Sequence, residues 1–120
     1  MLAGFPPGNV RAIASDEKFC IRVGELSRTI AADRAAGRIP FAVVANAGTT
    51  NTGAVDDLIA VSEIARAEGL WLHIDGAYGG FFALTDRGRR TMAGLERGDR
   101  NRPLDPGLVM ACFDDGAGEP

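Results

Sequence analysis

Two short apolar runs constrain the fold of this chain more than any other feature. Residues 41–45 (FAVVA) and 70–75 (LWLHID) each have the length of one strand and are apolar over most of that length. Continuous apolar runs of this length are typical of strands that are buried on both faces of a parallel sheet. The two runs therefore predict neighbouring central strands of an α/β fold.

The stretch between these runs has the pattern of an amphipathic helix over about residues 56–68. Asp56 is placed to cap its first turn, and Gly69 is placed to end it. Apolar side chains recur inside the stretch at helical spacing: Leu58, Val61, and Ile64 or Ala65. A strand, a helix and a second strand with short connections indicate a βαβ unit in an open sheet.

The first 40 residues predict one further strand and one further helix. Residues 9–14 (NVRAIA) alternate as a strand does, and Ser15 or Asp16 can cap the helix that follows. Gly37 is placed to end this helix. Its expected apolar face consists of Phe19, Val23, Leu26 and Ile30. The predicted architecture is a mostly parallel sheet with flanking helices.

Composition excludes several classes of protein. The 120 residues are 46% hydrophobic with a net charge of −3, which is typical of one globular domain without a basic nucleic-acid surface. No apolar run reaches membrane-spanning length, and we read no signal peptide at the N-terminus. Cys20 and Cys112 are far apart, and one histidine is too few for a zinc site, so we interpret both cysteines as reduced thiols of a cytoplasmic protein.

Candidate functional residues follow the two predicted central strands. Ligands of open α/β sheets bind beyond the carboxyl ends of strands, where this chain carries GTTNTG (48–53) and HIDGAYGG (73–80). A carboxylate at the end of a buried strand, as Asp75 is, needs a compensating partner. Asp75 either caps a neighbouring loop through backbone N–H groups or holds a cation beneath a flat ring. The small residues that follow it either leave room for that ring or form a tight turn.

These two segments resemble the group II pyridoxal-phosphate-dependent amino-acid decarboxylases, which include aromatic amino-acid and glutamate decarboxylases. The similarity is carried by AVVANAGTTNTGAVDDL (42–58) together with LWLHIDGAYGG (70–80), at this separation. The resemblance implies the three-layer large domain of fold type I pyridoxal-phosphate enzymes, a homodimer, and an amino-acid substrate. We therefore assign residues 1–102 to part of that cofactor-binding domain and residues 103–120 to a divergent tail.

The resemblance also implies roles for four residues. Asp75 takes the place of the aspartate that pairs with the pyridine nitrogen of pyridoxal 5′-phosphate, and Ala77 takes the place of the alanine that lies against the ring. Thr50 corresponds to a threonine near the cofactor and substrate, and His73 to a histidine with a supporting role. We expect Thr50 and Asp75 to face one half-open pocket, and Phe41, Val43 and Trp71 to leave an exposed apolar patch.

The sequence departs from the family pattern in a minor way at Gly76, where alanine is usual, and more strongly at the lysine motif. The stretch Leu104–Leu108 retains the Asp-Pro of the family's Asp-Pro-His-Lys but lacks the His-Lys, and Lys18 is the sole lysine in the sequence. We therefore assign no catalytic residue, because the Schiff-base lysine is absent. The chain is interpreted as a fragment of a carboxy-lyase that is inactive alone. The alternative is a non-catalytic, truncated or frameshifted remnant with at most a structural or partner-binding role.

Overall fold

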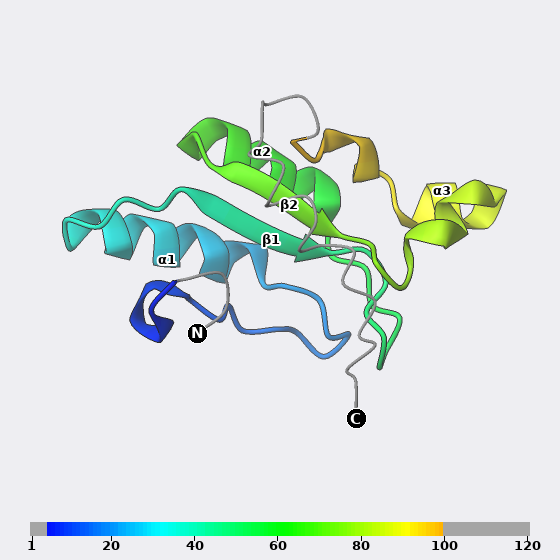
Figure 1. The fold of residues 1–120 in the computed structure, drawn as a ribbon, viewed down its shortest axis with the longest axis horizontal. Helices are drawn as coiled ribbons and strands as arrows, with labels where there is room; N and C mark the ends of the chain where they lie inside the picture. The colour runs from blue at the N-terminus through cyan, green and yellow to red at the C-terminus, as the bar shows by residue number, and fades with distance from the viewer. Residues whose placement is uncertain (1–4, 100–120) are drawn as a thin grey trace.

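The computed structural model describes residues 5–99, which form an α/β unit around one parallel sheet (Figure 1). The elements are, in chain order, a 3-10 turn (Pro7–Asn9), α1 (Val23–Ala35), β1 (Ala42–Asn46), α2 (Leu58–Glu68), β2 (Trp71–Asp75), a 3-10 turn (Gly80–Leu84), α3 (Asp86–Thr91) and a 3-10 turn (Leu95–Arg97). No helix within residues 5–99 is long and apolar enough to cross a membrane. The predicted strand, helix and strand are confirmed, while the tail 103–120 lies outside the described residues.

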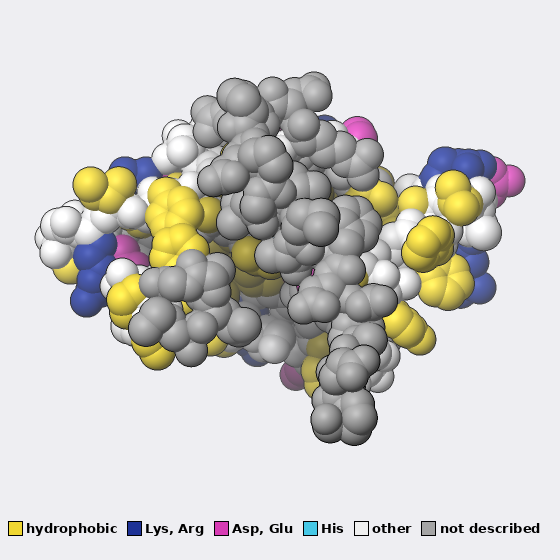
Figure 2. Space-filling view, in the orientation of Figure 1, with side chains coloured by type: hydrophobic (Ala, Val, Ile, Leu, Met, Phe, Trp, Pro, Cys, Tyr) yellow, Lys and Arg dark blue, Asp and Glu magenta, His cyan; other side chains and the backbone are white. Residues whose placement is uncertain are grey.

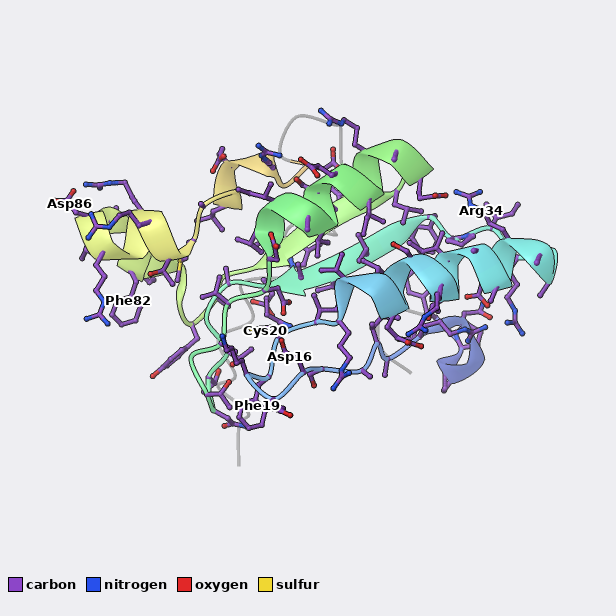
Figure 3. All side chains as sticks on the ribbon, turned by 180° about the vertical axis from the view of Figure 1, so that it is seen from behind. Asp16, Phe19, Cys20, Arg34, Phe82 and Asp86 are labelled. Atoms are coloured by element: carbon purple, nitrogen blue, oxygen red, sulfur yellow. The ribbon has the colours of Figure 1, made fainter. Side chains whose placement is uncertain are left out.

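Strands β1 and β2 pair in parallel, and their register brings their carboxyl ends together. Asn46 lies opposite Asp75, the last residue of each strand. One face of the sheet packs against α1 and α2, which lie on the same side of it (Figures 1 and 3). The core between these layers consists chiefly of Leu26, Ile30, Val43, Ala45, Leu58, Val61, Ala65 and Leu72. Burial of this apolar surface is the main stabilising contribution to the fold.

The prediction that both strands are buried on both faces is wrong for the described residues. Val44 is 55% exposed, because both helices cover the opposite face of the sheet. Phe41, which precedes β1, is 58% exposed. Residues 5–99 thus supply two of the three expected layers. The predicted apolar patch of Phe41, Val43 and Trp71 is therefore wrong: only Phe41 is exposed, whereas Trp71 is half-buried and Val43 is buried beneath the helices.

The segment before α1 differs from its prediction in two ways. Residues 10–14 form no strand, and the backbone there makes only an isolated bridge between Ser15 and Ile21. Helix α1 begins at Val23 instead of near Ser15, because the Asp16 carboxylate closes a turn: it accepts hydrogen bonds from the backbone N–H groups of Lys18 and Cys20. Phe19 consequently lies in this turn and not on the helix.

The predicted end of α1 at Gly37 is confirmed. Gly37 has a φ of 75°, and its N–H donates to the Arg34 carbonyl, while the Arg38 N–H donates to the Asp33 carbonyl. This pair of bonds is the Schellman arrangement, in which a residue in the left-handed conformation ends the helix. Glycine adopts that conformation without the steric cost of a Cβ atom.

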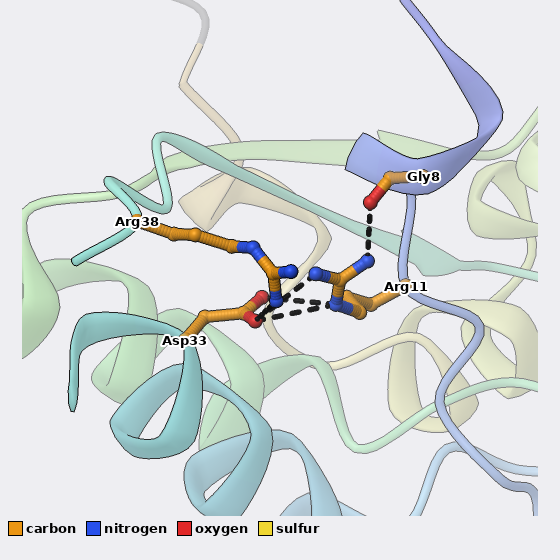
Figure 4. Close-up of polar contacts among 4 residues, drawn as sticks. All are labelled: Gly8, Arg11, Asp33 and Arg38. Atoms are coloured by element: carbon orange, nitrogen blue, oxygen red, sulfur yellow. Dashed lines mark hydrogen bonds and ion pairs between the residues drawn. The ribbon is translucent and has the colours of Figure 1, made fainter. Parts of the chain in front are cut away.

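A cluster of ionic contacts fixes the N-terminal segment to the end of α1 (Figure 4). The Asp33 carboxylate accepts hydrogen bonds from Arg38 Nη1 at 2.8 Å and from Arg11 Nη2 at 3.1 Å. Arg11 also donates to the Gly8 carbonyl at 2.6 Å. The hydrogen bonds from Arg38, and then those from Arg11, lower the pKa of Asp33 below its ordinary value of 3.8.

This cluster predicts a pH-dependent contribution to stability. Because the pKa of Asp33 is lower in the folded chain, its contribution is complete above the ordinary pKa of 3.8 and is lost as the pH falls through the folded value. We expect Asp33→Asn to lower the urea midpoint of unfolding at pH 7, and we expect the difference from wild type to shrink toward pH 2.5. A difference that stays constant across this range would show that the ionic contacts contribute no stability.

The segment after the sheet, residues 80–91, carries apolar and basic side chains together on its surface. Phe81, Phe82 and Leu84 are all exposed, as is Arg90 on α3. Figure 2 shows this mixture at the end of the molecule where α3 lies. The 3-10 turn and α3 pack closely, because a Cβ atom at Gly88 would lie 1.7 Å from the Phe82 carbonyl oxygen.

Candidate functional site

The loops that follow β1 and β2 meet at one edge of the sheet. The N–H of Ala47 donates to the Asp75 carbonyl at 2.7 Å, which continues the pairing of the strands by one residue. A Cβ atom at Gly79 would lie 2.5 Å from the Ala47 oxygen and 2.5 Å from Gly48 Cα. The two loops therefore touch backbone to backbone, and this approach requires a residue without a side chain at position 79.

The loop after β1 folds back on itself as a short hairpin. Ala47 and Val55 form an antiparallel bridge, and the hydroxyl oxygens of Thr49 and Thr52 lie 2.6 Å apart. Both hydroxyl oxygens also accept from the Ala54 N–H. Thr49 and Thr52 thus stabilise the hairpin, and Thr50 between them is exposed.

A pocket of about 440 Å³ lies between these loops, and it brings together three of the four predicted site residues. Thr50, Asp75 and Ala77 line it, together with Phe19 and Tyr78. This volume is within the usual range of small-molecule sites. The structure therefore confirms that Thr50 and Asp75 lie at the same edge of the sheet and line the same open pocket.

His73, the fourth predicted residue, lies on β2 outside this set. It is half-buried, pairs in the register with Val44, and does not line the pocket. His73 and Asp75 are two residues apart on a strand, so they lie on the same face of the sheet. His73 therefore lies on β2 two residues before Asp75, and it is not part of the pocket lining.

The Asp75 carboxylate caps the loop that follows it, which is one of the two roles that the sequence left open. Its Oδ1 atom accepts the Ala77 N–H at 3.0 Å, so Asp75 does cap its own loop. The side chain is nevertheless exposed, and Oδ2 has no hydrogen bond within residues 5–99. The cap holds the carboxylate in one orientation at the pocket and leaves one oxygen available to a ligand.

The small residues after Asp75 form a tight turn more than an open space. The Gly80 N–H donates to the Gly76 carbonyl at 2.7 Å, and a Cβ atom at Gly76 would lie 3.3 Å from Gly80 Cα. Gly79 is buried against the other loop. Ala77, by contrast, is exposed in the pocket wall, so it is the position at which a flat group can approach.

Asp56 is a site-organising residue whose role the sequence did not reveal. It is buried, and its Oδ1 accepts the Ile21 N–H at 2.6 Å while its Oδ2 accepts the Asn46 N–H at 2.7 Å. The predicted helix cap is instead Asp57, which accepts the Ala60 N–H at 3.0 Å. Asp56 therefore joins the segment before α1 to the end of β1.

Cys20 packs against the same region without the character of a reactive thiol. Its Sγ atom lies 3.2 Å from the Val55 carbonyl oxygen, and burial raises the pKa of the thiol above its ordinary value of 9.0. A thiol with a raised pKa is a poor nucleophile near neutral pH. Cys112 lies outside the described residues, and within residues 5–99 no cluster of His, Cys, Asp or Glu could hold a metal ion.

The side chains of the pocket fit the pyridine ring of pyridoxal phosphate better than they fit its phosphate group. A carboxylate with a free oxygen suits a protonated ring nitrogen, and the small Ala77 allows a flat ring to lie against the backbone. No lysine or arginine lines the pocket within the described part of the chain. The described residues therefore fit the ring of such a cofactor, and they offer no cation for its phosphate.

Comparison with known proteins shows the family that this chain resembles. The model of the pyridoxal-dependent decarboxylase conserved domain matches residues 3–106. The chain is 42% identical over 103 residues to aromatic-L-amino-acid decarboxylase of Bacillus atrophaeus, covering 86% of this chain and 21% of that protein. It is 38% identical over 96 residues to human cysteine sulfinic acid decarboxylase, covering 80% and 20%.

Solved structures show the same likeness in three dimensions. Tryptophan decarboxylase of Catharanthus roseus, solved with L-tryptophan, aligns with a TM-score of 0.75 at 38% identity and covers 82% of this chain and 21% of its own. A TDC of Oryza sativa solved with PLP aligns with a TM-score of 0.75 at 36% identity over 82% and 21%.

This chain belongs to the pyridoxal-dependent decarboxylase family. Its α/β unit corresponds to part of the fold type I architecture expected from the sequence, and the cofactor of the family is pyridoxal phosphate. The chain spans about a fifth of the length of the relatives it matches.

Proposed function

We propose that this chain forms the ring-binding part of the pyridoxal phosphate site of an amino-acid decarboxylase, with Asp75 pairing with the pyridine nitrogen. The observation that supports this most is the Asp75 carboxylate itself. It ends β2, is held by the Ala77 N–H, and lines one pocket with Thr50. By the resemblance to the family, these are the side chains that would face the cofactor.

The chemistry of the cofactor explains why a carboxylate belongs there. Its ring, when bound, accepts the electron pair that is left as carbon dioxide departs from an amino acid. Asp75 keeps the ring nitrogen protonated through a charge-assisted hydrogen bond. Ala77 offers the ring a flat contact, and the Thr50 hydroxyl donates to a polar group at the rim. His73 supports Asp75 from the same face of β2.

The described residues hold the cofactor only in part. Lys18 is exposed in the turn before α1 and does not line the pocket. One charge-assisted hydrogen bond contributes about 1.5–3 kcal/mol. We therefore propose that this chain alone binds the cofactor weakly and does not catalyse. The amino-acid substrate, the homodimer and a cytoplasmic location belong to the proposal for the complete protein.

The alternative is a non-catalytic remnant with a structural or partner-binding role. Its support is the missing His-Lys after Asp105-Pro106. A remnant of this kind needs no ligand in the pocket, so it predicts that Asp75 can be replaced without consequence for binding.

A titration separates the two proposals. We expect pyridoxamine 5′-phosphate, which cannot label an amine covalently, to bind the purified chain in the millimolar range, as followed by NMR. Asp75→Asn should weaken this binding about tenfold, because the asparagine cannot supply the charge. Asp86→Asn, on exposed α3, is the matched control and should bind as wild type does. Equal affinity of Asp75→Asn and wild type would refute the proposal.

A further inference from the structure

We infer that Phe19 is an aromatic wall of this pocket and determines its preference for flat rings. The inference rests on the proposed function, because it concerns the ring that stands on Asp75. Phe19 comes from a segment far from both motifs in the sequence, yet it lines the same pocket as Asp75 and Ala77. Figure 3 shows Phe19 at the tip of its turn, beside Asp16 and Cys20.

The conformation of Phe19 is unusual and is imposed by its turn. Its φ of 63° is the only positive value at a non-glycine position within residues 5–99. This region is unfavourable for a bulky L residue. The turn is held by the Asp16 carboxylate, which accepts from the Lys18 and Cys20 N–H groups, and by the Asp16 carbonyl, which accepts from Phe19 itself.

The turn is also anchored to the strand end that forms the pocket. Ile21, two residues beyond Phe19, donates to buried Asp56, whose other oxygen accepts from Asn46 at the end of β1. Cys20 Sγ contacts the Val55 carbonyl on the far side of the hairpin. Phe19 therefore has a fixed position relative to Asp75, which is opposite Asn46 in the register.

Core packing does not account for this arrangement. Phe19 is 64% exposed, so its ring gains little from burial among residues 5–99. A strained backbone that presents an exposed ring into a pocket is typical of a ligand contact. An aromatic face favours a second flat ring in offset or edge-to-face packing. The chemistry that Phe19 recognises is therefore a planar aromatic ring.

Such a ring has two possible sources, and two ligands distinguish them. Pyridoxamine 5′-phosphate presents the pyridine of the cofactor, and L-tryptophan presents the side chain of an aromatic substrate. L-Glutamate serves as the amino acid without a ring. All three are titrated into the 120-residue chain, with binding followed by NMR.

Phe19→Gly is the informative variant, because glycine accepts the positive φ and keeps the turn. We expect its thermal midpoint to equal or exceed that of wild type, and its affinity for at least one ring ligand to fall about 3- to 10-fold. A loss for pyridoxamine 5′-phosphate assigns Phe19 to the cofactor ring, and a loss confined to tryptophan assigns it to the substrate. Phe19→Tyr should retain binding, and glutamate should be unaffected by every substitution.

Two results would overturn the inference, and they differ in what they say of the proposed function. If Phe19→Gly binds both ring ligands as wild type does while Asp75→Asn still loses pyridoxamine 5′-phosphate, Phe19 has no role and the proposed function stands. If wild type binds neither ring ligand, the inference about Phe19 and the proposed function are both wrong.

Discussion

Replacing Asp56 by alanine is expected to lower the free energy of unfolding by roughly 3–5 kcal/mol, because it removes a buried carboxylate that accepts two backbone hydrogen bonds. The Asp56 side chain is 5% exposed, and it accepts the N–H groups of Ile21 and Asn46 at 2.6 and 2.7 Å. Alanine would leave both backbone donors, which belong to the half-buried residues Ile21 and Asn46, without this partner. Domains of this size are marginally stable, so we expect most of the variant to be unfolded at 25 °C.

The neighbouring aspartate provides a matched control. Asp57 is exposed and accepts one N–H at the start of α2, so Asp57→Ala should cost about 0.5–2 kcal/mol, the usual effect of losing a helix cap. Urea denaturation followed by circular dichroism measures both variants. If Asp56→Ala costs no more than Asp57→Ala, Asp56 does not hold the segment before α1 against β1.

The second large effect is expected at Gly79. A methyl group there would overlap the Ala47 oxygen and Gly48 Cα, both at 2.5 Å, and both neighbours are backbone atoms that cannot rotate away. Gly79→Ala should therefore lower the free energy of unfolding by roughly 2–4 kcal/mol. It should also separate the two loops that line the pocket and abolish detectable binding of pyridoxamine 5′-phosphate.

Gly80 is the control for this substitution, one residue further along the chain. A Cβ atom at Gly80 would meet nothing within 4 Å, and Gly80 has no positive φ. We expect Gly80→Ala to unfold within about 0.5 kcal/mol of wild type and to retain binding. Thermal unfolding and the same titration compare the two variants, and equal behaviour would mean that the close contact of the loops is not needed.

The parts of the fold that were predicted correctly are those with a strong local signal. The apolar run 41–45 and the stripe from Leu58 to Ala65 specify a strand and a helix through their own periodicity. Gly37 and Gly69 end their helices because each occupies a left-handed position, at φ of 75° and 67°. These features depend on a few neighbouring residues, so the sequence alone predicts them.

The wrong predictions depend on partners that are distant in the sequence. Residues 9–14 alternate as a strand does, but alternation indicates only an extended backbone and supplies no neighbouring strand. Asp16 closes a turn instead of starting a helix, since an aspartate serves equally well in either role. Burial of β1 on one face follows from α1 and α2 sharing a side of the sheet, which no local pattern encodes.

The candidate site was predictable to the extent that strand ends determine it. The carboxyl ends of neighbouring parallel strands lie at the same edge of a sheet, so the sequence alone predicts that Thr50, Asp75 and Ala77 lie close together. Phe19 and Asp56 were missed, because a turn with positive φ and a buried carboxylate have no signature in adjacent residues. The roles of Asp75, Ala77, Thr50 and His73 toward the cofactor stay predictions.

The protonation of the ring nitrogen tests the central claim most directly. Pyridoxamine 5′-phosphate labelled with ¹⁵N in the ring is added to the chain at a pH at which the free ring nitrogen is deprotonated. We predict that the bound ligand shows the ¹⁵N chemical shift of a protonated pyridinium with wild type, and that of the neutral ring with Asp75→Asn. The same ring-nitrogen shift with both proteins would contradict the assignment of Asp75.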